Sequence, residues 1–491
     1  MKVRLTALFC AVSLAVSPAV AQVSLPDLGD ASASTMSESQ ERTIGNRIMR
    51  EVRIDPAYVD DPEIADYISA LGARLLAAAE SGTRRDLDFF VVQDDTINAF
   101  ALVGGHIGVH SGLIQVTQTE SELAAVIGHE IAHIMQKHQA RMAAGMGRSS
   151  MTSLAALALA ILAARDGGSG QMTEAAMATA SAFQMQNMLD YTREHEREAD
   201  RVGLTLLERA GFDPRGAAGV FERLLRANRL NEFKGAPSYL RTHPLSTERI
   251  ADMQDRMERL ERGFSMRASD NFEYRLVKAK LRANSGSGAE AVKIFNALLA
   301  DRAIVRPRED VYGLALALKR TRDFDGAWRT LAPIREGASH PAFEFLAAQI
   351  RAGQGRHDEA LAIYRAALVT SPRYRALVYG HLDQLLQTGH AKEVIAELEE
   401  RMRTTNDDPR LFELQARAYE ASGRRLAQHR AQAEAFYRKG NLAAAVEQLE
   451  LAVRSKGTEN FYELSSAESR LRELRSHLEN ERAAEKALKI S

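Results

Sequence analysis

The chain has 491 residues, which is more than a single domain usually contains. Hydrophobic residues make up 45% of it and charged residues 26%, and the formal net charge is −1. These values are ordinary for globular protein. Without an excess of positive charge or a basic stripe, the sequence argues against binding to nucleic acid.

The N-terminal segment 1–21 has the pattern of a cleaved secretory signal. A basic start precedes a short apolar run that ends in the letters AVA, and this run is too short to span a bilayer comfortably. The only cysteine, Cys10, lies within it. The mature chain would therefore contain neither a disulfide nor a thiol ligand. We expect export to the periplasm of a bacterium, with a flexible leader over residues 22–40.

Residues 41–263 are predicted to form one mainly helical domain with a small β region. The stretch LDFFVVQDD (87–95) has a short apolar run between polar residues, which indicates a strand. NAFALVGGHIGVHSGLI (98–114) has two apolar runs around a Gly-Gly pair, which indicates a hairpin. SELAAVIGHEIAHIMQKHQARMA (121–143) predicts a long helix with Thr119 or Ser121 as its N-cap.

The segment 151–189 is unusually rich in alanine and methionine. Its apolar run MTSLAALALAILAA is interrupted by RDGGSGQ, and it is shorter than a membrane-spanning helix. Two interpretations stay open at this point. The segment forms a buried helical hairpin, or it forms an adaptable lid or membrane-facing loop near the site, for which methionine is well suited.

Residues 270–480 contain an internal repeat. Gly355, Gly389 and Gly423 follow one another at intervals of 34 residues, the period of tetratricopeptide helix pairs. Small and aromatic residues recur at matching positions, where neighbouring helices must approach closely: Ala348, Ala360, Tyr364, Ala367, Ala433, Phe436 and Ala445, with weaker copies at Ala291, Phe295, Ala315 and Ala327. We expect an α-solenoid whose concave surface receives peptides or partner proteins.

The stretch HEIAH contains the residues from which metal chemistry is predicted. His129 and His133 are four residues apart, so a helix places both imidazoles on one face, toward one metal ion. With Glu130 they form the H-E-x-x-H pattern of zinc peptidases. Zinc would polarise the scissile carbonyl, and Glu130 would act as general base. His138 is expected to lie off the metal-binding face of this helix and to be exposed to solvent.

A catalytic zinc ion usually has three protein ligands, and the stretch YTREHEREADRVG (191–203) offers candidates for the third. On a helix Glu196 and Asp200 share one face, and Glu194 and Glu198 share another. The first pair is attractive, because one carboxylate could bind the ion while the other accepts a hydrogen bond from a ligand histidine. The alternative interpretation is a charged helix face exposed to solvent. The spacing alone does not choose between the pairs.

HEIAH followed by EREAD resembles the M48 metallopeptidases. NAFALVGGHIGVHSGL also resembles their strand region, with Val103 where a proline is frequent, and THPLSTERI (242–250) resembles their His-Pro segment. The resemblance implies a zincin-like domain that binds one Zn²⁺ per chain. It further implies that His129, His133 and Glu196 are zinc ligands and that Glu130 is the general base. Asp200 would be the partner of a ligand histidine, and His243 would act as a latch or stabilise the oxyanion.

A secreted M48 domain followed by tetratricopeptide repeats resembles the subgroup that acts in outer-membrane β-barrel assembly. This implies a periplasmic endopeptidase that degrades misfolded or stalled outer-membrane proteins and assists their assembly. It also implies contact of the repeats with the barrel-assembly machinery and peripheral association with the membrane. One alternative is a chaperone or adaptor with a latent or structural zinc site. Another is an integral-membrane M48 enzyme, which would need apolar runs of ~20 residues that we do not find.

Overall fold

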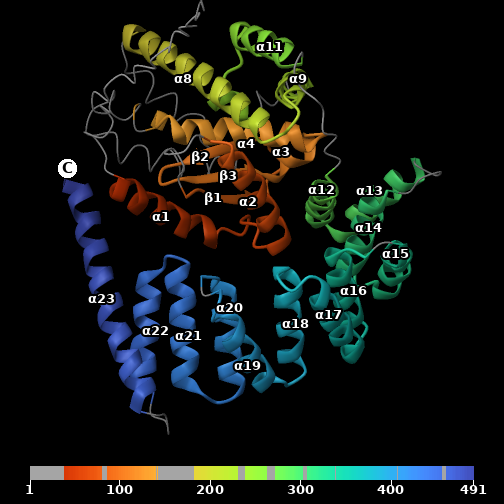
Figure 1. Cartoon of the computed structure of the whole chain (residues 1–491), viewed down its shortest axis with the longest axis vertical. Coiled ribbons are helices and arrows are strands. Elements are labelled where there is room, and N and C mark those ends of the chain that lie inside the picture. Colours follow the sequence, from red (N-terminus) through yellow and green to blue (C-terminus); the bar gives the residue numbers. More distant parts are fainter. Residues whose placement is uncertain are drawn as a thin grey trace, which may run out of the picture.

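The computed structural model describes residues 38–79, 86–139, 141, 182–230, 238–261, 271–301, 307–337, 339–405, 407–455 and 461–490. The predicted signal segment 1–21, residues 22–37 of the leader and residues 151–181 of the apolar segment lie outside this part. The fold is mainly helical with one three-stranded sheet, as predicted (Figure 1). Among the described residues, no helix combines the length and the apolar character needed to cross a membrane.

The sheet contains β1 (Asp88–Val92), β2 (Ala99–Leu102) and β3 (His106–His110) in the order β1-β3-β2. β2 and β3 form the predicted antiparallel hairpin, and β1 runs parallel to β3. The hairpin turn contains Gly104 and Gly105 at φ 89° and 90°, a conformation that only glycine adopts readily. The outer side of β1 is bridged by Tyr58, so β2 is the open edge within the described part of the chain.

Alternate residues of a strand point to opposite faces of the sheet. Helices cover both of these faces. Phe89 and Val91 belong to the main core, which includes apolar side chains of α2 and α4. Phe90 and Val92 pack with α1 instead. The helices of this domain are α1 (Glu38–Ile54), α2 (Pro62–Ala77), α3 (Ser111–Val116), α4 (Glu120–Met135), α8 (Ala182–Arg209), α9 (Arg215–Leu230), α10 (Ser238–Thr242) and α11 (Thr247–Glu261).

The helices α4 and α8 cross at two glycines. A Cβ atom on Gly128 would lie 3.2 Å from the Gly203 carbonyl oxygen, and one on Gly203 would lie 3.0 Å from the His129 amide nitrogen. Such close backbone approach requires residues without side chains. The crossing therefore sets the acidic face of α8 directly against the first histidine of α4.

The helix α4 begins as predicted but ends earlier. The Thr119 side chain accepts a hydrogen bond from the Glu122 amide and caps the helix. The helix then ends at Met135, whereas the sequence pattern predicted continuation to residue 143. Lys137 has a left-handed backbone, with φ 52°, and this conformation cannot continue an α-helix. The chain changes direction here, and the residues that follow do not lie where an uninterrupted helix would place them.

After this N-terminal domain the chain forms successive antiparallel helix pairs (Figure 1). Gly355, Gly389 and Gly423 occupy the same turn within three successive pairs, each with a positive φ of 72–83°. A positive φ is the usual way to end a helix before a sharp turn. The helices are α12 (Phe272–Asn284), α13 (Gly288–Asp301), α14 (Arg308–Arg320), α15 (Phe324–Gly337), α16 (Pro341–Gly353), α17 (His357–Thr370), α18 (Arg375–Gln387), α19 (Ala391–Arg401), α20 (Pro409–Ala421), α21 (Arg425–Arg438), α22 (Leu442–Arg454) and α23 (Phe461–Ile490).

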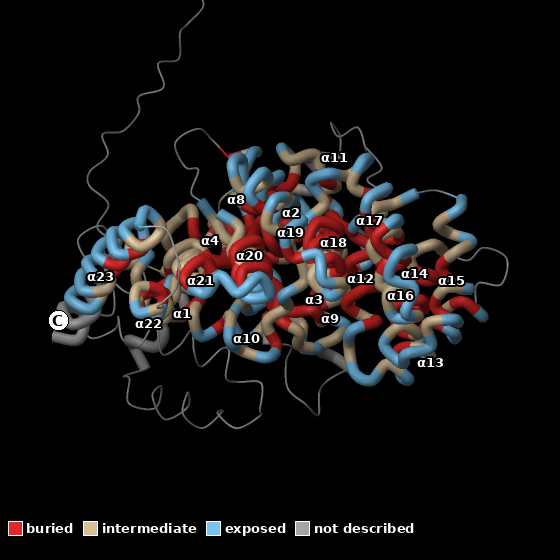
Figure 2. The backbone as a smooth tube through the Cα atoms, turned by 90° about the horizontal axis from the view of Figure 1, so that it is seen from below, coloured by how far each residue is buried: buried red, intermediate tan, exposed pale blue. Residues whose placement is uncertain are grey.

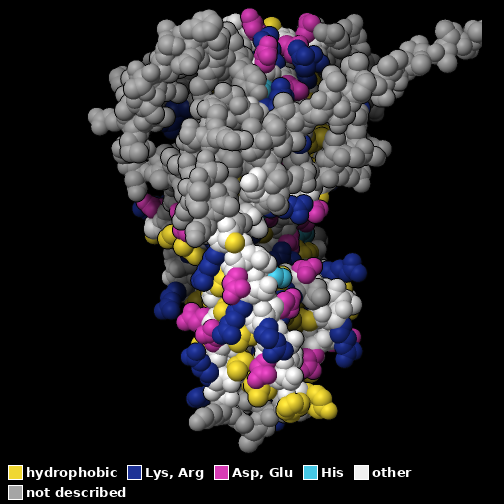
Figure 3. Space-filling model, turned by 90° about the vertical axis from the view of Figure 1, so that its left-hand side faces the viewer, with side chains coloured by type: hydrophobic (Ala, Val, Ile, Leu, Met, Phe, Trp, Pro, Cys, Tyr) yellow, Lys and Arg dark blue, Asp and Glu magenta, His cyan; other side chains and the backbone are white. Residues whose placement is uncertain are grey.

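The small residues of the repeats lie between neighbouring helices. Ala315, Ala327, Ala348 and Ala360 are fully buried, as is Phe295. Figure 2 shows the buried stretches along the inner sides of the helices, with exposed stretches facing outward. On the face seen in Figure 3, basic and acidic side chains of the described repeat residues are interspersed rather than gathered by sign. The repeat surface on this side therefore presents no single-sign field.

The repeats contact the N-terminal domain at their first helix, at α18 in the middle of the stack and at their C-terminal end. At the C-terminal end, Arg50 of α1 forms an ion pair with Glu481 of α23 at 2.5 Å. Arg53 donates to the Lys439 carbonyl oxygen at 3.0 Å, where α21 ends. Figure 1 shows the repeats curving beneath the N-terminal domain, so that α23 returns alongside α1.

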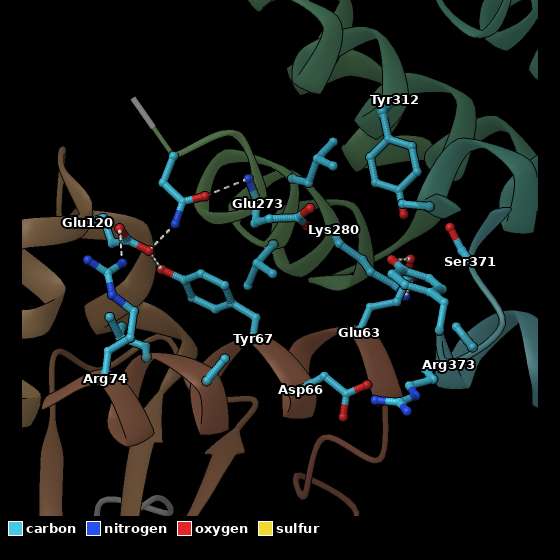
Figure 4. A pocket seen from close by; sticks show the side chains of 18 of the residues that line it. Glu63, Asp66, Tyr67, Arg74, Glu120, Glu273, Lys280, Tyr312, Ser371 and Arg373 are labelled. Atoms are coloured by element: carbon cyan, nitrogen blue, oxygen red, sulfur yellow. Dashed lines mark hydrogen bonds and ion pairs between the residues drawn. The ribbon is translucent and has the colours of Figure 1, made fainter. Parts of the chain in front are cut away.

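Elsewhere, α2 meets the first repeat helix, α12, and the start of α18 at a seam of charged side chains. Lys280 of α12 contacts Asp61 at 2.6 Å and also pairs with Glu63. The Tyr374 hydroxyl donates to Glu63 at 2.5 Å. A cleft of about 550 Å³ lies beside these residues (Figure 4). Its apolar walls include Leu71, and its charged residues largely satisfy one another.

Candidate metal centre

Four side chains from three separate segments converge in the N-terminal domain. His129 and His133 come from α4, Glu196 comes from α8, and His243 follows α10. One nitrogen or oxygen of each lies within 4.8 Å of the others. The Nε2 atoms of His129 and His133 are 3.0 Å apart. Glu196 Oε2 lies 3.4 Å from the His129 nitrogen, and Glu196 Oε1 lies 3.4 Å from the His133 nitrogen. The possible ligand atoms of these three side chains therefore face a common centre.

The orientation of His129 is fixed from behind by a carboxylate and a guanidinium. The Asp200 Oδ1 lies 3.0 Å from His129 Nδ1, which leaves Nε2 free toward the centre. Arg249 holds Asp200 with two hydrogen bonds of 2.7 and 2.8 Å. Its Nη1 also lies 2.9 Å from Glu196 Oε2 and donates to the Pro244 carbonyl oxygen at 2.7 Å. Arg249 therefore joins α8, the carboxylates and the His-Pro segment.

The structure places the two candidate carboxylate pairs in different surroundings. Glu196 and Asp200 are buried next to the histidines of α4. Glu194 is exposed, and Glu198 turns to His138 and Arg141, at 2.9 Å from each. Of the two pairs left open by the spacing, only the first faces the convergence point.

At Glu196 and Asp200, burial and the neighbouring side chains shift the pKa in opposite directions. Burial raises the pKa of Glu196, but electrostatic attraction to His243 and the nearby imidazoles of His129 and His133 lower it well below its usual range. Burial likewise raises the pKa of Asp200, and hydrogen bonds from Arg249 and His129 reverse the effect and lower it. Both groups are therefore ionised at neutral pH.

In the metal-free protein, the two histidines of α4 differ in their protonation. Burial lowers the pKa of His129, yet hydrogen bonds to Asp200 and Glu196 overcome this and raise it to about 10. Burial also lowers the pKa of His133, and repulsion from His129 and His243 helps bring it to about 3 despite the nearby Glu196 carboxylate. His133 is thus neutral at pH 7, and His129 keeps a proton that a metal ion would displace.

Glu130 carries a buried oxygen without a hydrogen bond. Its side chain is 1% exposed. Its Oε1 has no hydrogen-bond partner among the described residues, and His243 Nε2 lies 3.5 Å away. An unsatisfied buried carboxylate oxygen is unfavourable unless another group occupies its neighbourhood. Two imidazoles and a carboxylate are the donor types that hold catalytic divalent metals, so the residues fit such an ion with Glu130 beside it.

His243 closes the fourth side of the cluster. Its Nδ1 is 2.9 Å from Glu196 Oε1, and its ring lies 5.1 Å from the rings of both α4 histidines. Tyr239 packs against it at 4.7 Å. Burial, together with the negative charges of Glu130 and Glu196, raises the pKa of Tyr239 well above its usual range. The Tyr239 hydroxyl therefore stays protonated beside the site.

The prediction that His138 is exposed is wrong, because His138 is 3% exposed. That prediction extended the α4 helix past Lys137, where the backbone turns. His138 instead comes back to the cluster, with Nδ1 2.8 Å from His133 Nδ1 and Nε2 2.9 Å from Glu198 Oε2. His195 stacks on its ring at 4.2 Å.

Sequence reasoning missed further residues that shape the site. Arg249 and Tyr239 carry no local signal, since an arginine or tyrosine in a short helix is most often a surface or core residue. Gly128 and Gly203 each stand inside a helical pattern, where a glycine is a reason to look for a close packing contact. Only the contact itself reveals that their partner is the other helix.

A histidine pair four residues apart, a carboxylate on a crossing helix and a buried glutamate beside them define a metallopeptidase site. The profile of peptidase family M48 matches residues 62–257, and the chain belongs to this family of metallopeptidases. The chain is 33% identical over 446 residues to the beta-barrel assembly-enhancing protease of Escherichia coli (strain K12), with 89% of each chain covered. The protein of the same name from Yersinia pestis is 30% identical over 432 residues, with 87% of this chain and 86% of the relative covered. A putative beta-barrel assembly-enhancing protease of Vibrio cholerae is 36% identical over 319 residues, with 63% of each covered.

Proposed function

We propose that the protein is a zinc endopeptidase of the periplasm that acts on outer-membrane β-barrel proteins. It degrades misfolded or stalled clients and assists assembly, with the repeats in contact with the barrel-assembly machinery. The observation that carries the catalytic part is the convergence of His129, His133 and Glu196 beside the unsatisfied oxygen of Glu130. The names of the relatives, which match over most of the chain, support the client class.

In this proposal His129, His133 and Glu196 hold one zinc ion. When bound, zinc polarises a carbonyl and makes water a stronger acid. Glu130 then takes a proton from the attacking water as the new C–O bond forms. It delivers that proton to the amide nitrogen as the C–N bond breaks. Asp200, fixed by Arg249, keeps the His129 ring turned toward the ion throughout.

His243 keeps the described arrangement closed. Its Nε2 lies 3.5 Å from Glu130 Oε1, within the space that the attacking water needs. We propose that, with zinc bound, His243 would serve as a further ligand in the resting enzyme and would move away when a client binds. In the open state the same imidazole is available to stabilise the oxyanion, and variants at this position distinguish the two roles.

A client segment has a place to add along the sheet. Extended peptides often bind by pairing with an open sheet edge, and β2 is that edge. The Ala101 carbonyl oxygen of β2 accepts a hydrogen bond of 2.6 Å from the Gln139 side chain. We propose that a client strand displaces Gln139 and presents its carbonyl to the metal centre.

The test uses the chain from residue 22 and follows zinc content together with cleavage of casein and of an unfolded outer-membrane barrel protein. Glu130→Gln should keep about one zinc per chain and lose cleavage by at least ~10²-fold, since general-base catalysis contributes that much. The matched control is Glu194→Gln, the same substitution at an exposed position of α8, which should cleave normally. Cleavage by Glu130→Gln at the wild-type rate would refute the proposed role of this residue.

His243→Ala separates the two roles of the histidine. If His243 is a latch, cleavage of casein should rise; if it mainly stabilises the oxyanion, cleavage should fall while zinc stays bound. The closure of the site by His243 also favours a second candidate function, an assembly adaptor with a latent zinc site. That candidate is adopted if zinc binds but neither the wild type nor His243→Ala cleaves the barrel protein.

A further inference from the structure

We propose that His138 and Glu198 form a positioning relay for His133, which fixes the tautomer of that metal ligand and the direction of its ring. The inference rests on the proposed metal site but not on cleavage. It starts from an unbroken line of contacts: Glu198 Oε2 to His138 Nε2 at 2.9 Å, and His138 Nδ1 to His133 Nδ1 at 2.8 Å. His133 Nε2 then faces His129 and Glu196.

The order of donors along this line follows from the carboxylate at its outer end. An ionised carboxylate only accepts hydrogen bonds, so the Nε2 of His138 must donate. In the neutral ring Nδ1 is then the acceptor, and the Nδ1 of His133 must donate to it. The remaining nitrogen, His133 Nε2, keeps a free lone pair. Glu198 thus dictates, through two rings, which nitrogen of His133 is available to a metal.

The relay has a direct counterpart on the other ligand. Asp200 accepts from His129 Nδ1 without an intermediate and leaves His129 Nε2 free. Glu198 does the same for His133 across a longer distance. Both carboxylates come from α8, and each is held by an arginine, Asp200 by Arg249 and Glu198 by Arg141. A single helix therefore orients both imidazoles of α4.

The surroundings of His138 hold its ring in place. The side chain is 3% exposed. The ring of His195 stacks on one side, 4.2 Å away and nearly parallel at 11°. The left-handed residue Lys137 sets the direction in which His138 leaves α4. These contacts account for a buried histidine that lies outside the group of four converging side chains.

Two substitutions at His138 separate a hydrogen-bonding role from simple packing. The side-chain oxygen of asparagine stands near the position of Nδ1, so His138→Asn keeps an acceptor for His133 and loses the contact with Glu198. The amide of glutamine reaches the position of Nε2, so His138→Gln keeps the contact with Glu198 and loses the acceptor. Each variant retains one of the two hydrogen bonds, and we expect similar thermal stability of the metal-free proteins.

The measurements are the zinc dissociation constant, by competition with a chromophoric chelator, and the visible spectrum of the Co²⁺-substituted protein. His138→Gln should weaken zinc binding roughly 10–100-fold, the usual effect of losing a group that orients a ligand, and should change the Co²⁺ spectrum. His138→Asn should remain near wild type in both. The proposal is overturned if His138→Gln binds zinc as tightly as wild type, or if the folded His138→Asn binds as weakly as His138→Gln. If the wild type binds zinc but cleaves no protein, the proposed function fails and these comparisons keep their meaning.

Discussion

The metal centre and the seam between α2 and α12 both bury charged side chains, but with opposite outcomes. At the seam Lys280 contacts Asp61 and Glu63, and Tyr374 adds a hydrogen bond. At the metal centre the ligand atoms face inward, and one oxygen of Glu130 has no hydrogen bond within the described part of the chain. Charged side chains that are fully paired hold two parts of a fold together. Side chains that converge without being fully paired leave a place for a ligand.

The largest effect should come from the crossing that creates the metal centre. Gly203→Val would push a side chain against the His129 backbone, which lies 3.0 Å from a Cβ at this position. We expect loss of zinc binding and little soluble protein, because neither backbone can withdraw without repacking the core. Soluble yield and zinc content measure this.

The matched control for this prediction is Gly337→Val. Gly337 also lies in a helix, but nothing stands within 4 Å of a Cβ added there. It should express and bind zinc normally. Normal zinc binding by Gly203→Val would show that the close crossing is unnecessary for the site.

The seam should respond in stability and not in zinc binding. Lys280→Met leaves Asp61 and Glu63 without their buried cation, and the loss of one member of such a group costs about 3–5 kcal/mol. The free energy of unfolding from denaturant titration should fall accordingly, while the zinc dissociation constant stays unchanged. Lys293→Met, at an exposed position, is the control. A change in zinc affinity for Lys280→Met would mean that the two regions are coupled.

The metal centre should also show a pH dependence that sharpens the contrast. His129, with its pKa raised to about 10, must release one proton when zinc binds, whereas His133, with its pKa lowered to about 3, is already neutral. Between pH 6 and pH 9 the zinc affinity should therefore rise about tenfold for each pH unit, the slope for one released proton. Isothermal titration in buffers of different ionisation enthalpy counts these protons. Two protons released per zinc at pH 7 would contradict the assignment.

The raised pKa of His129 also makes the stability of the metal-free protein depend on pH. The folded pKa of His129 lies above its usual value of 6.5. The stability that its proton provides is therefore complete below pH 6.5 and disappears as pH rises toward 10. Thermal unfolding of zinc-free protein over this range should show the decline.

The smallest effect is expected at the edge of the seam. Tyr374→Phe removes the hydrogen bond of 2.5 Å to Glu63, which is worth about 1–2 kcal/mol for a charged acceptor in this partly buried position. Denaturant titration should detect it, with Tyr462→Phe, at a residue 77% exposed, as control. Equal stability of the two variants would mean that this bond adds nothing to the seam.

What the sequence could predict depended on how local the signal was. The β2–β3 hairpin and the repeat turns at Gly355, Gly389 and Gly423 follow from short patterns, and the structure has them there. The histidine pair of α4 likewise follows from one helical turn. Helical spacing alone left two carboxylate pairs open, because both pairs lie on the same helix and only the crossing with α4 distinguishes them.

The rest depended on contacts between distant segments. The Arg249 guanidinium reaches Asp200 across 49 residues, and nothing near Arg249 in the sequence indicates this. His138 was misplaced because a single left-handed residue, Lys137, redirects the chain. Residues 151–181, for which a hairpin or a lid was expected, lie outside the described part of the chain, and that expectation remains a prediction.

The attachment of the repeats at both ends has a consequence for their number. In an open solenoid each unit contacts only its neighbours, so units can be gained or lost with little effect on the others. Here the first pair is anchored at Lys280 and the last helix at Glu481. Between these two points, Tyr374 at the start of α18 also holds the repeats to Glu63. A pair added to or removed from the stack would take at least one of these contacts away from its partner. The distance between α2 and α1 therefore fixes the number of repeats that this architecture can hold.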